Sequence, residues 1–320
     1  MALKNWLDVM ENSSCELLSG SFPNVSELEN LRWTILVNLV FNNFLSYTAI
    51  MLNVVTIHVI RKTSSLPNTL KTLLLNLAVT DVGVGLIVQP IYSSLLVRWL
   101  QQNIEDCNFR DVFVTILTTF CLTSFLGVVA VSADRFLAIH LHLRYQELVT
   151  HKRVVAVVIS IWLLGVICPV VVLCLMPDMS SLLTLFGFVG LFLTTTVYIR
   201  IYFTARRHKN QIQALQVQDL GENNEMASFA SLVKSAVGIF YVYLVFLICY
   251  MPLLICSVVS EINGPSVALK SWIIFSVTFL FLGSSLNPVI YCWKMRHIRR
   301  AIMDILQNMS WVGNRASHLC

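Results

Sequence analysis

The stretch VVAVVISIWLLGVICPVVVLCLMP, residues 154–177, contains no Asp, Glu, Lys or Arg. A helix rises about 1.5 Å per residue and the hydrocarbon core of a bilayer is about 30 Å thick, so this stretch is long enough to cross a membrane. Six further stretches have the same character: 33–60, 72–97 with only Asp81 inside it, 112–133, 179–199, 235–260 and 271–293. We therefore expect an all-α membrane protein, a bundle of seven transmembrane helices.

The composition of the whole chain supports this fold class. Of 320 residues, 57% are hydrophobic and only 12% are charged, and the mean hydropathy is +0.74. A soluble domain has about a quarter charged residues, so a soluble enzyme, a coiled coil and a disordered chain are all excluded. A transmembrane β-barrel would instead show short segments of alternating hydrophobicity.

The distribution of Lys and Arg predicts the orientation. Cytoplasmic loops carry an excess of these residues. Of the 22 in the chain, the segments on the N-terminal side of the membrane hold five: Lys4, Arg32, Arg98, Arg110 and Lys270. We expect an extracellular tail over residues 1–31, a transmembrane domain over 32–293 and a cytoplasmic segment over 294–320, in the plasma membrane. The net charge of +5 then reflects orientation and not nucleic-acid binding.

The outer segments carry modification signals. The first thirty residues lack the basic start, the short apolar run and the small-residue cleavage site of a signal peptide, so we expect the first span to direct its own insertion. Asn12 and Asn24 begin glycosylation sequons in the predicted extracellular tail. Cys107 could form a disulfide with Cys174 or with Cys15, and the sequence leaves the pairing open.

Residues 294–306 follow the last span and read KMRHIRRAIMDIL. Apolar residues recur there at helical spacing against basic ones, which predicts a short amphipathic helix on the anionic inner membrane surface. A solvated basic tail is the alternative. Cys320 at the end of the chain is a candidate for palmitoylation.

A few polar residues interrupt the apolar spans. Asp81 is the one ionisable residue deep in a span, and an ionisable group there is a functional candidate because its charge is costly in hydrocarbon. Carboxylate, amide and hydroxyl oxygens suit a hard cation such as sodium. The alternative is a hydrogen-bonded Asp that only joins helices. Four spans also contain a proline, which predicts kinks at Pro90, Pro169, Pro252 and Pro288.

Several short motifs occur one after another along these spans. They are Asn53, Leu77-Ala78 with Asp81, Asp134-Arg135-Phe136, Trp162, Phe246 with Cys249-Tyr250-Met251-Pro252, and Asn287-Pro288-Val289-Ile290-Tyr291. Together they resemble a rhodopsin-like (class A) G-protein-coupled receptor. A very short second outer loop, Gly190 in place of the usual helix-five proline, and Leu143-Arg144-Tyr145 after helix three look like the melanocortin and adenosine branch.

The resemblance implies a receptor, not an enzyme, that passes an extracellular ligand signal to a heterotrimeric G protein through outward movement of helix six. It implies that Asp134 restrains Arg135 in the resting state of the receptor. Phe136 is the third residue of this motif. It implies further switch residues at Tyr198, Asn287, Pro288 and Tyr291, and insertion of Leu143 into the G protein. Leu232 stands where many relatives carry an acid that binds the helix-three arginine, so some basal activity is expected.

Two binding sites follow from the same resemblance. A sodium-type pocket would comprise Asp81, Asn53, Ser124, Ser284 and Asn287, although Gly283 stands where a polar residue often completes the shell. The ligand pocket would be mostly apolar, and its ligand stays unknown because the acids that bind peptides or amines in relatives are absent here. Simple helix packing is the alternative for these residues: Leu117, Thr118, Cys121, Phe246, Tyr250, Leu253, Leu254, Val277 and Phe281.

The alternative function is a small seven-helix transporter without G-protein coupling. A transporter typically shows internal repeats and paired interrupted helices, which this sequence lacks. A retinal protein would need a lysine in residues 271–293, where there is none. No close pairing of cysteines and no spacing of histidines predicts a metal centre, so a structural sodium ion near Asp81 is the one candidate cofactor.

Overall fold

The computed structural model describes residues 22–63, 66–103, 107–141, 144–175, 187–200 and 223–294, with residues 185, 203, 299 and 303. Five of the seven predicted spans correspond to α2 (Val25–Lys62), α5 (Cys107–Leu141), α7 (His151–Leu175), α9 (Asn223–Asn263) and α10 (Val267–Lys294). The second span is formed by α3 (Asn68–Gly83), a π-helical turn η1 (Val84–Val88) and α4 (Gln89–Leu100). A single turn, α6 (Tyr145–Leu148), lies between α5 and α7.

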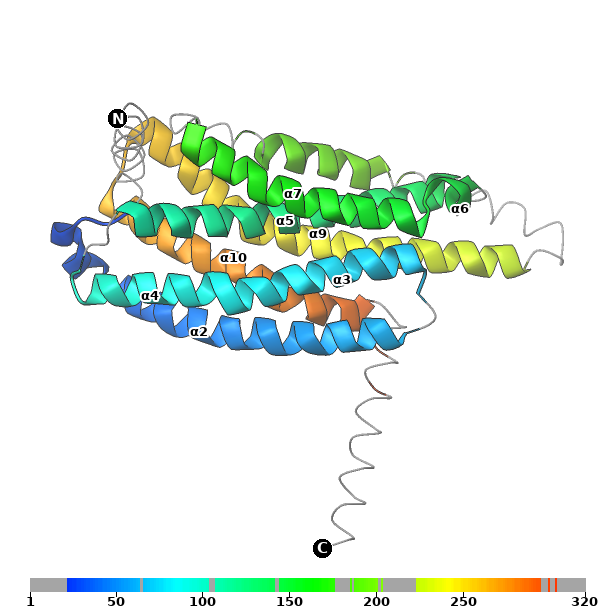
Figure 1. Ribbon diagram of the computed structural model, residues 1–320, viewed down its shortest axis with the longest axis horizontal. Coiled ribbons are helices and arrows are strands. Elements are labelled where there is room, and N and C mark those ends of the chain that lie inside the picture. Colours follow the sequence, from blue (N-terminus) through cyan, green and yellow to red (C-terminus); the bar gives the residue numbers. More distant parts are fainter. Residues whose placement is uncertain are drawn as a thin grey trace, which may run out of the picture.

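The fifth span is described in part. Six helices are long and apolar enough to cross a membrane, and a shorter apolar helix covers Gly187–Arg200. Residues 179–184 and 186 of the predicted span lie outside the described residues. Because α7 and α9 run in the same direction in Figure 1, the chain must cross the bundle between them. The seven-helix bundle predicted from the charge-free stretches is confirmed.

The helices lie side by side with nearly parallel axes (Figure 1). The last helix, α10, packs against both α2 and α9, and α5 packs against α3, α7 and α9. Buried side chains form two clusters, one of which includes Leu70, Val131 and Tyr243 and the other Leu31, Tyr92 and Phe281. Trp162 of α7 joins α3 by donating its indole N–H to Asn76 Oδ1 at 2.9 Å.

Hydroxyl groups within the helices bond to their own backbone. Thr80, Thr123 and Ser132 each donate to the carbonyl oxygen four residues earlier, at 2.6–2.9 Å. Hydrocarbon offers no hydrogen-bond partner, so a hydroxyl in a span needs one within the protein. This internal pairing lets polar residues occupy apolar helices without breaking them.

The prolines have different effects on the helices. Pro90 lies at the start of α4, directly after the π-helical turn, where the Gln89 N–H donates to Val84 O, five residues back. Proline lacks an N–H and its ring crowds the preceding turn, so a wider turn before it relieves the clash. Pro169, Pro252 and Pro288 lie inside helices that continue through them.

Close contact between α5 and α7 depends on Gly165. A Cβ atom at this position would lie 2.1 Å from Thr123 Oγ1 and 3.4 Å from Thr119 O. The Thr123 hydroxyl is already held by Thr119 O at 2.8 Å, so it cannot move away without losing that bond. Small residues of this kind allow helix backbones to approach within a membrane.

We therefore expect Gly165→Val to destabilise the protein by overpacking the contact between α5 and α7, which typically costs about 1–3 kcal/mol. In detergent, its apparent Tm should fall by several degrees. Ala156→Val is the matched control, since Ala156 is an exposed position of the same helix. Equal Tm values for the two variants would show that the α5–α7 contact does not depend on the glycine.

Candidate functional site

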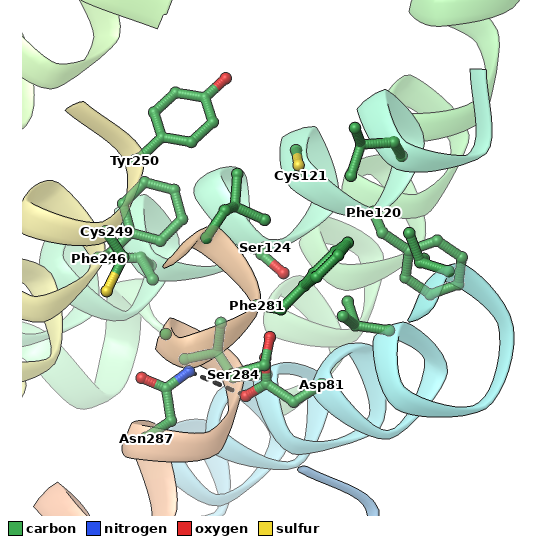
Figure 2. A pocket seen from close by; sticks show the side chains of 17 residues that line it. Asp81, Phe120, Cys121, Ser124, Phe246, Cys249, Tyr250, Phe281, Ser284 and Asn287 are labelled. Carbon is green, nitrogen blue, oxygen red and sulfur yellow. Dashed lines mark hydrogen bonds between the residues drawn. The ribbon is translucent and has the colours of Figure 1, made fainter. Parts of the chain in front are cut away.

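A cavity of about 40 Å³ lies inside the bundle. It is lined by the second span, α5, α9 and α10: Leu77, Asp81, Val84, Val88, Leu117, Phe120, Cys121, Ser124, Val128, Phe246, Cys249, Tyr250, Leu280, Phe281, Gly283, Ser284 and Asn287. Figure 2 shows Asp81, Ser284 and Asn287 close together. Phe281 lies above Asp81 in this view, on the side of Cys121. The predicted sodium-type and ligand pockets therefore share one space.

The polar part of the cavity is centred on Asp81, which is only 2% exposed. Asn287 of α10 donates its Nδ2 to Asp81 Oδ2 at 2.9 Å. Asn53 of α2 lies nearby without lining the cavity, and its Nδ2 donates to Ser284 O at 3.0 Å and to Ala49 O at 2.8 Å. Two amides and one carboxylate thus connect three spans at this depth.

The donor set of this polar part fits a small hydrated cation. Asp81 supplies a carboxylate, and Ser124 and Ser284 supply hydroxyl oxygens to the same cavity. Asn53 Oδ1 is buried and accepts no hydrogen bond from the described residues, as expected of an atom that a water molecule or an ion completes. A cavity of about 10–15 Å³ holds one water, so the space suffices. Gly283 contributes no side-chain oxygen.

The apolar part of the cavity contains five of the nine predicted ligand-pocket residues: Leu117, Cys121, Phe246, Tyr250 and Phe281. The rings of Phe246 and Tyr250 stack with centroids 5.4 Å apart. The other four, Thr118, Leu253, Leu254 and Val277, do not line it. Thr118 donates to Val114 O within α5, and Leu254 and Val277 are buried in helix packing.

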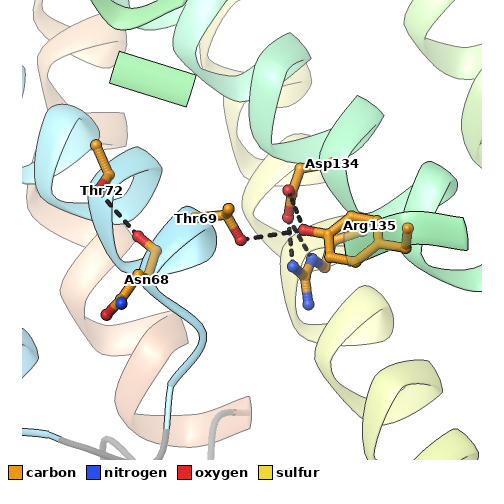
Figure 3. Close-up of polar contacts among 6 residues, drawn as sticks. Asn68, Thr69, Thr72, Asp134 and Arg135 are labelled. Atoms are coloured by element: carbon orange, nitrogen blue, oxygen red, sulfur yellow. Dashed lines mark hydrogen bonds and ion pairs between the residues drawn. The ribbon is translucent and has the colours of Figure 1, made fainter. Parts of the chain in front are cut away.

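Arg135 and Asp134 form a buried ion pair near the C-terminal end of α5 (Figure 3). Arg135 Nε donates to Asp134 Oδ2 at 2.9 Å, and Nη2 donates to the same oxygen. The two side chains are 2% and 4% exposed. A buried charge pair requires further hydrogen bonds to be stable, because desolvation of both ions is costly.

Tyr145 of α6 supplies such a bond. Its O–H donates to Asp134 Oδ1 at 2.6 Å, and its oxygen lies 3.0 Å from the hydroxyl of Thr69 in α3. Burial, and next the bond to the Asp134 carboxylate, raise the pKa of Tyr145 to about 12, so the phenol stays a donor at neutral pH. In the sequence, Tyr145 is part of a subfamily motif. The sequence did not reveal that α6 would position its side chain next to Asp134.

The two tyrosines among the predicted switch residues, Tyr198 and Tyr291, lie in other surroundings than the Asp134–Arg135 pair. Tyr198 shares a hydrogen bond with Ser132 Oγ at 2.5 Å and donates weakly to Ile239 O at 3.4 Å. Tyr291 is 1% exposed, and its hydroxyl has no hydrogen-bond partner among the described residues. Phe136, beside the ion pair, stacks on His140 with ring centroids 5.5 Å apart.

Further contacts hold the N-terminal half of α9, and the sequence did not predict them. Tyr243 of α9 pairs with Thr195 Oγ1 at 2.5 Å and stacks on Tyr198 at 4.8 Å. Lys294 of α10 places its Nζ 3.9 Å from the ring centroid of Tyr241 in α9. Aromatic residues about two turns inside an apolar span are typical of ordinary helix packing, so only the neighbouring helices reveal these contacts.

Some predicted sites lie outside the described residues. They are Leu143, the glycosylation site at Asn12, Cys320, most of the amphipathic segment 294–306, the thiols of Cys15, Cys107 and Cys174, and the Leu232 side chain. The second sequon begins at Asn24, which is exposed directly before α2. Its backbone N–H donates to Glu27 Oε2 at 2.8 Å.

Comparison with known proteins agrees with these motifs. The sequence matches the 7 transmembrane receptor (rhodopsin family) over residues 52–181 and 176–291. It is 25% identical to the adenosine receptor A2b of Gallus gallus over 286 residues, covering 77% of this chain and 81% of that receptor. It is 24% identical to the melanocortin receptor 4 of Danio rerio over 278 residues, covering 84% and 83%.

Both branches expected from the loop and helix-five features are therefore represented among the similar proteins. Members of this family are receptors and not enzymes, and the match favours a receptor over a transporter. The charge-free spans, the Asp134–Arg135 pair, the Asp81–Asn287 bond and the match across most of the chain lead to one conclusion: this protein belongs to the rhodopsin family of seven-transmembrane, G-protein-coupled receptors.

Proposed function

We propose that this receptor transmits an extracellular ligand signal to a heterotrimeric G protein by outward movement of the inner half of α9. The observation that carries the proposal is the buried pairing of Arg135 with Asp134 and Tyr145. In this arrangement Arg135 is bonded to a residue of its own helix. We therefore assign the arrangement to the resting state of the receptor. Signalling requires an alternative arrangement in which Arg135 is released.

The contacts of α9 support this movement. Pro252 lies inside α9 and lacks a backbone donor, which favours bending at that point. Tyr243 and Tyr241 lie nine and eleven residues before it and attach the inner half of α9 to the fifth span and to Lys294. Outward movement would break these contacts, so they stabilise the resting arrangement.

The proposed resting state is weakly held. The contacts of α9 described above are neutral hydrogen bonds, worth about 0.5–1.5 kcal/mol each, and a cation–π contact. Position 232 carries Leu and not an acid, so it adds no ion pair to Arg135. A small free-energy difference between two states leaves the minor state measurably populated, and we therefore propose basal signalling.

The cavity supports a mostly apolar ligand. The apolar part of the cavity is lined by aromatic and aliphatic side chains, including Phe246, Tyr250 and Leu117. Pockets of this kind bind apolar molecules that make few polar contacts. We also propose that sodium binds near Asp81, which would hold α3 to α10 and favour the resting state.

The membrane placement follows the same proposal. The excess of Lys and Arg on one side supports an N-terminus outside the plasma membrane and an end of α10 inside it. Exposed Asn24 would then be accessible to glycosylation. The basic, periodic segment after α10 would lie on anionic membrane lipid.

We expect wild-type receptor in transfected cells to raise basal output of at least one G-protein pathway above that of mock-transfected cells. Arg135→Ala should remove this output at equal surface expression, because the side chain that engages the G protein is lost. Lys152→Ala is the control, since Lys152 is exposed at the inner end of α7. A receptor silent in every second-messenger pathway, with and without candidate ligands, would contradict the proposed function.

Removing the Tyr145 hydroxyl should raise basal output. Tyr145→Phe keeps the ring but deletes the bond to Asp134, and hydrogen bonds to charged groups contribute about 1.5–3 kcal/mol. If a third of this biases the two states, the active population rises about two- to fivefold. Tyr47→Phe, at a position 64% exposed on α2, should leave output unchanged. Unchanged or lower output of Tyr145→Phe would show that the phenol does not restrain Arg135.

The sodium proposal can be tested on purified receptor. Replacing N-methylglucamine chloride by NaCl at constant ionic strength should raise the Tm of wild type, because an ion that binds only the folded state stabilises it. Asp81→Asn should abolish this increase by removing the carboxylate, whereas Glu261→Gln, at an exposed acid, should not. Equal increases in wild type and Asp81→Asn would exclude a sodium site at Asp81.

A further inference from the structure

An ammonium group and two aromatic rings meet where the C-terminal end of α10 packs against α9. Lys294 Nζ lies 3.5 Å from the ring centroid of Trp293 and 3.9 Å from that of Tyr241. The two ring centroids are 5.5 Å apart, and the ring planes are inclined by 59°. One cation therefore contacts two rings, one on its own helix and one on the neighbouring helix.

The rings are the contacts that hold the ammonium group of Lys294. In the part of the chain that the structure describes, Lys294 Nζ makes no ion pair and donates no hydrogen bond. A cation is attracted to the electron-rich face of an aromatic ring within about 6 Å of its centroid, and more strongly where water is excluded. Tyr241 is half-buried against the core cluster that includes Tyr243, so this ring is partly shielded from water.

Trp293 and Tyr241 have different roles in this contact. Trp293 precedes Lys294 on α10, so a movement of α9 changes the distance between them little. Tyr241 lies on α9, so the same movement separates its ring from the ammonium group. Trp293 therefore orients the ammonium group toward α9, and Tyr241 supplies the part of the contact that can open.

The distance of Tyr241 from the bend in α9 makes the contact sensitive to movement. Tyr241 lies eleven residues before Pro252, which is about 16 Å along the helix axis. A rotation of about 20° at Pro252, the size of an ordinary helix kink, would displace Tyr241 by about 6 Å. The ring would then lie beyond the reach of the cation–π attraction. A modest bend is therefore enough to break the contact.

We propose that Lys294 is a charge-dependent positioning residue, which holds α9 in the resting state by joining Trp293 to Tyr241. The inference rests on the proposed outward movement of α9 and names the side chain whose charge opposes it. Position 232 carries Leu, which offers no charge to Arg135, so the charge that restrains α9 comes from α10. Loss of the charge at position 294 shifts the equilibrium between the two states toward the active one.

Basal output per receptor at the cell surface tests the role of the charge. Lys294→Met keeps a long unbranched side chain but removes the ammonium group. It should raise basal output about two- to fivefold, the range expected for a partly exposed cation–π contact. Lys294→Arg keeps a cation that stacks on aromatic rings, so its output should lie closer to wild type than to Lys294→Met. Lys152→Met is the matched control, since Lys152 is exposed on α7.

A second measurement changes the electrons of the ring and leaves its shape nearly constant. By suppression of a nonsense codon, position 241 receives phenylalanine or its analogues with one, two or three ring fluorine atoms. Fluorine withdraws electron density from the ring face and weakens the attraction. Basal output should therefore rise stepwise with the number of fluorine atoms. The same series in the Lys294→Met background should show no such trend, because no cation faces the ring.

The results separate this proposal from the proposed function. If Arg135→Ala removes basal output but the output is the same for wild type and Lys294→Met, the receptor function stands and the restraint by Lys294 is overturned. A fluorine series without a trend also overturns it, because the contact would then act by packing alone. If wild type and all variants are silent in every pathway, the proposed function fails, and the restraint fails with it.

Discussion

Hydrocarbon supplies no hydrogen bonds, and this constraint determines where each polar group of the bundle lies. Hydroxyls such as Thr80 and Ser132 bond to their own helix, and the Gln89 N–H finds Val84 O through the π-helical turn before Pro90. Charged groups need more, since an unpaired charge is costly at this depth. The helices are therefore joined at a few polar points, and each of these points is a candidate for a change of state.

The spans could be predicted from the sequence because their signal is long and depends only on the absence of charge. The pairing of Asp134 with Arg135 was also expected, since adjacent residues of a motif need no knowledge of the fold. The role of Tyr145 was not predictable: its bond to Asp134 depends on α6, a single turn whose position is set by packing against α5. The same holds for Tyr241 and Lys294, which meet only because α9 and α10 are neighbours.

The cavity shows the limit of assigning residues by motif. Sequence placed Asp81 and Tyr250 in two separate pockets, whereas the structure puts them in one. Conversely, Asn53 belongs to the expected polar set but lies behind Ser284, bonded to its backbone carbonyl. Spacing along a helix fixes depth and direction approximately. It does not decide which of two adjacent side chains reaches the space between helices.

A shared cavity has a consequence for how the two ends of the receptor communicate. The volume is about 40 Å³, so a ligand group that enters from the aromatic part reduces the room for a hydrated cation near Asp81. Asp81 is bonded to Asn287, and Tyr291 follows one turn later on α10 with a hydroxyl that has no hydrogen-bond partner among the described residues. A buried hydroxyl without a hydrogen-bond partner is costly. An arrangement of α10 that gives the Tyr291 hydroxyl a partner is therefore stabilised. In the proposed function, occupancy of the cavity and the position of Tyr291 would therefore be coupled through one turn of α10.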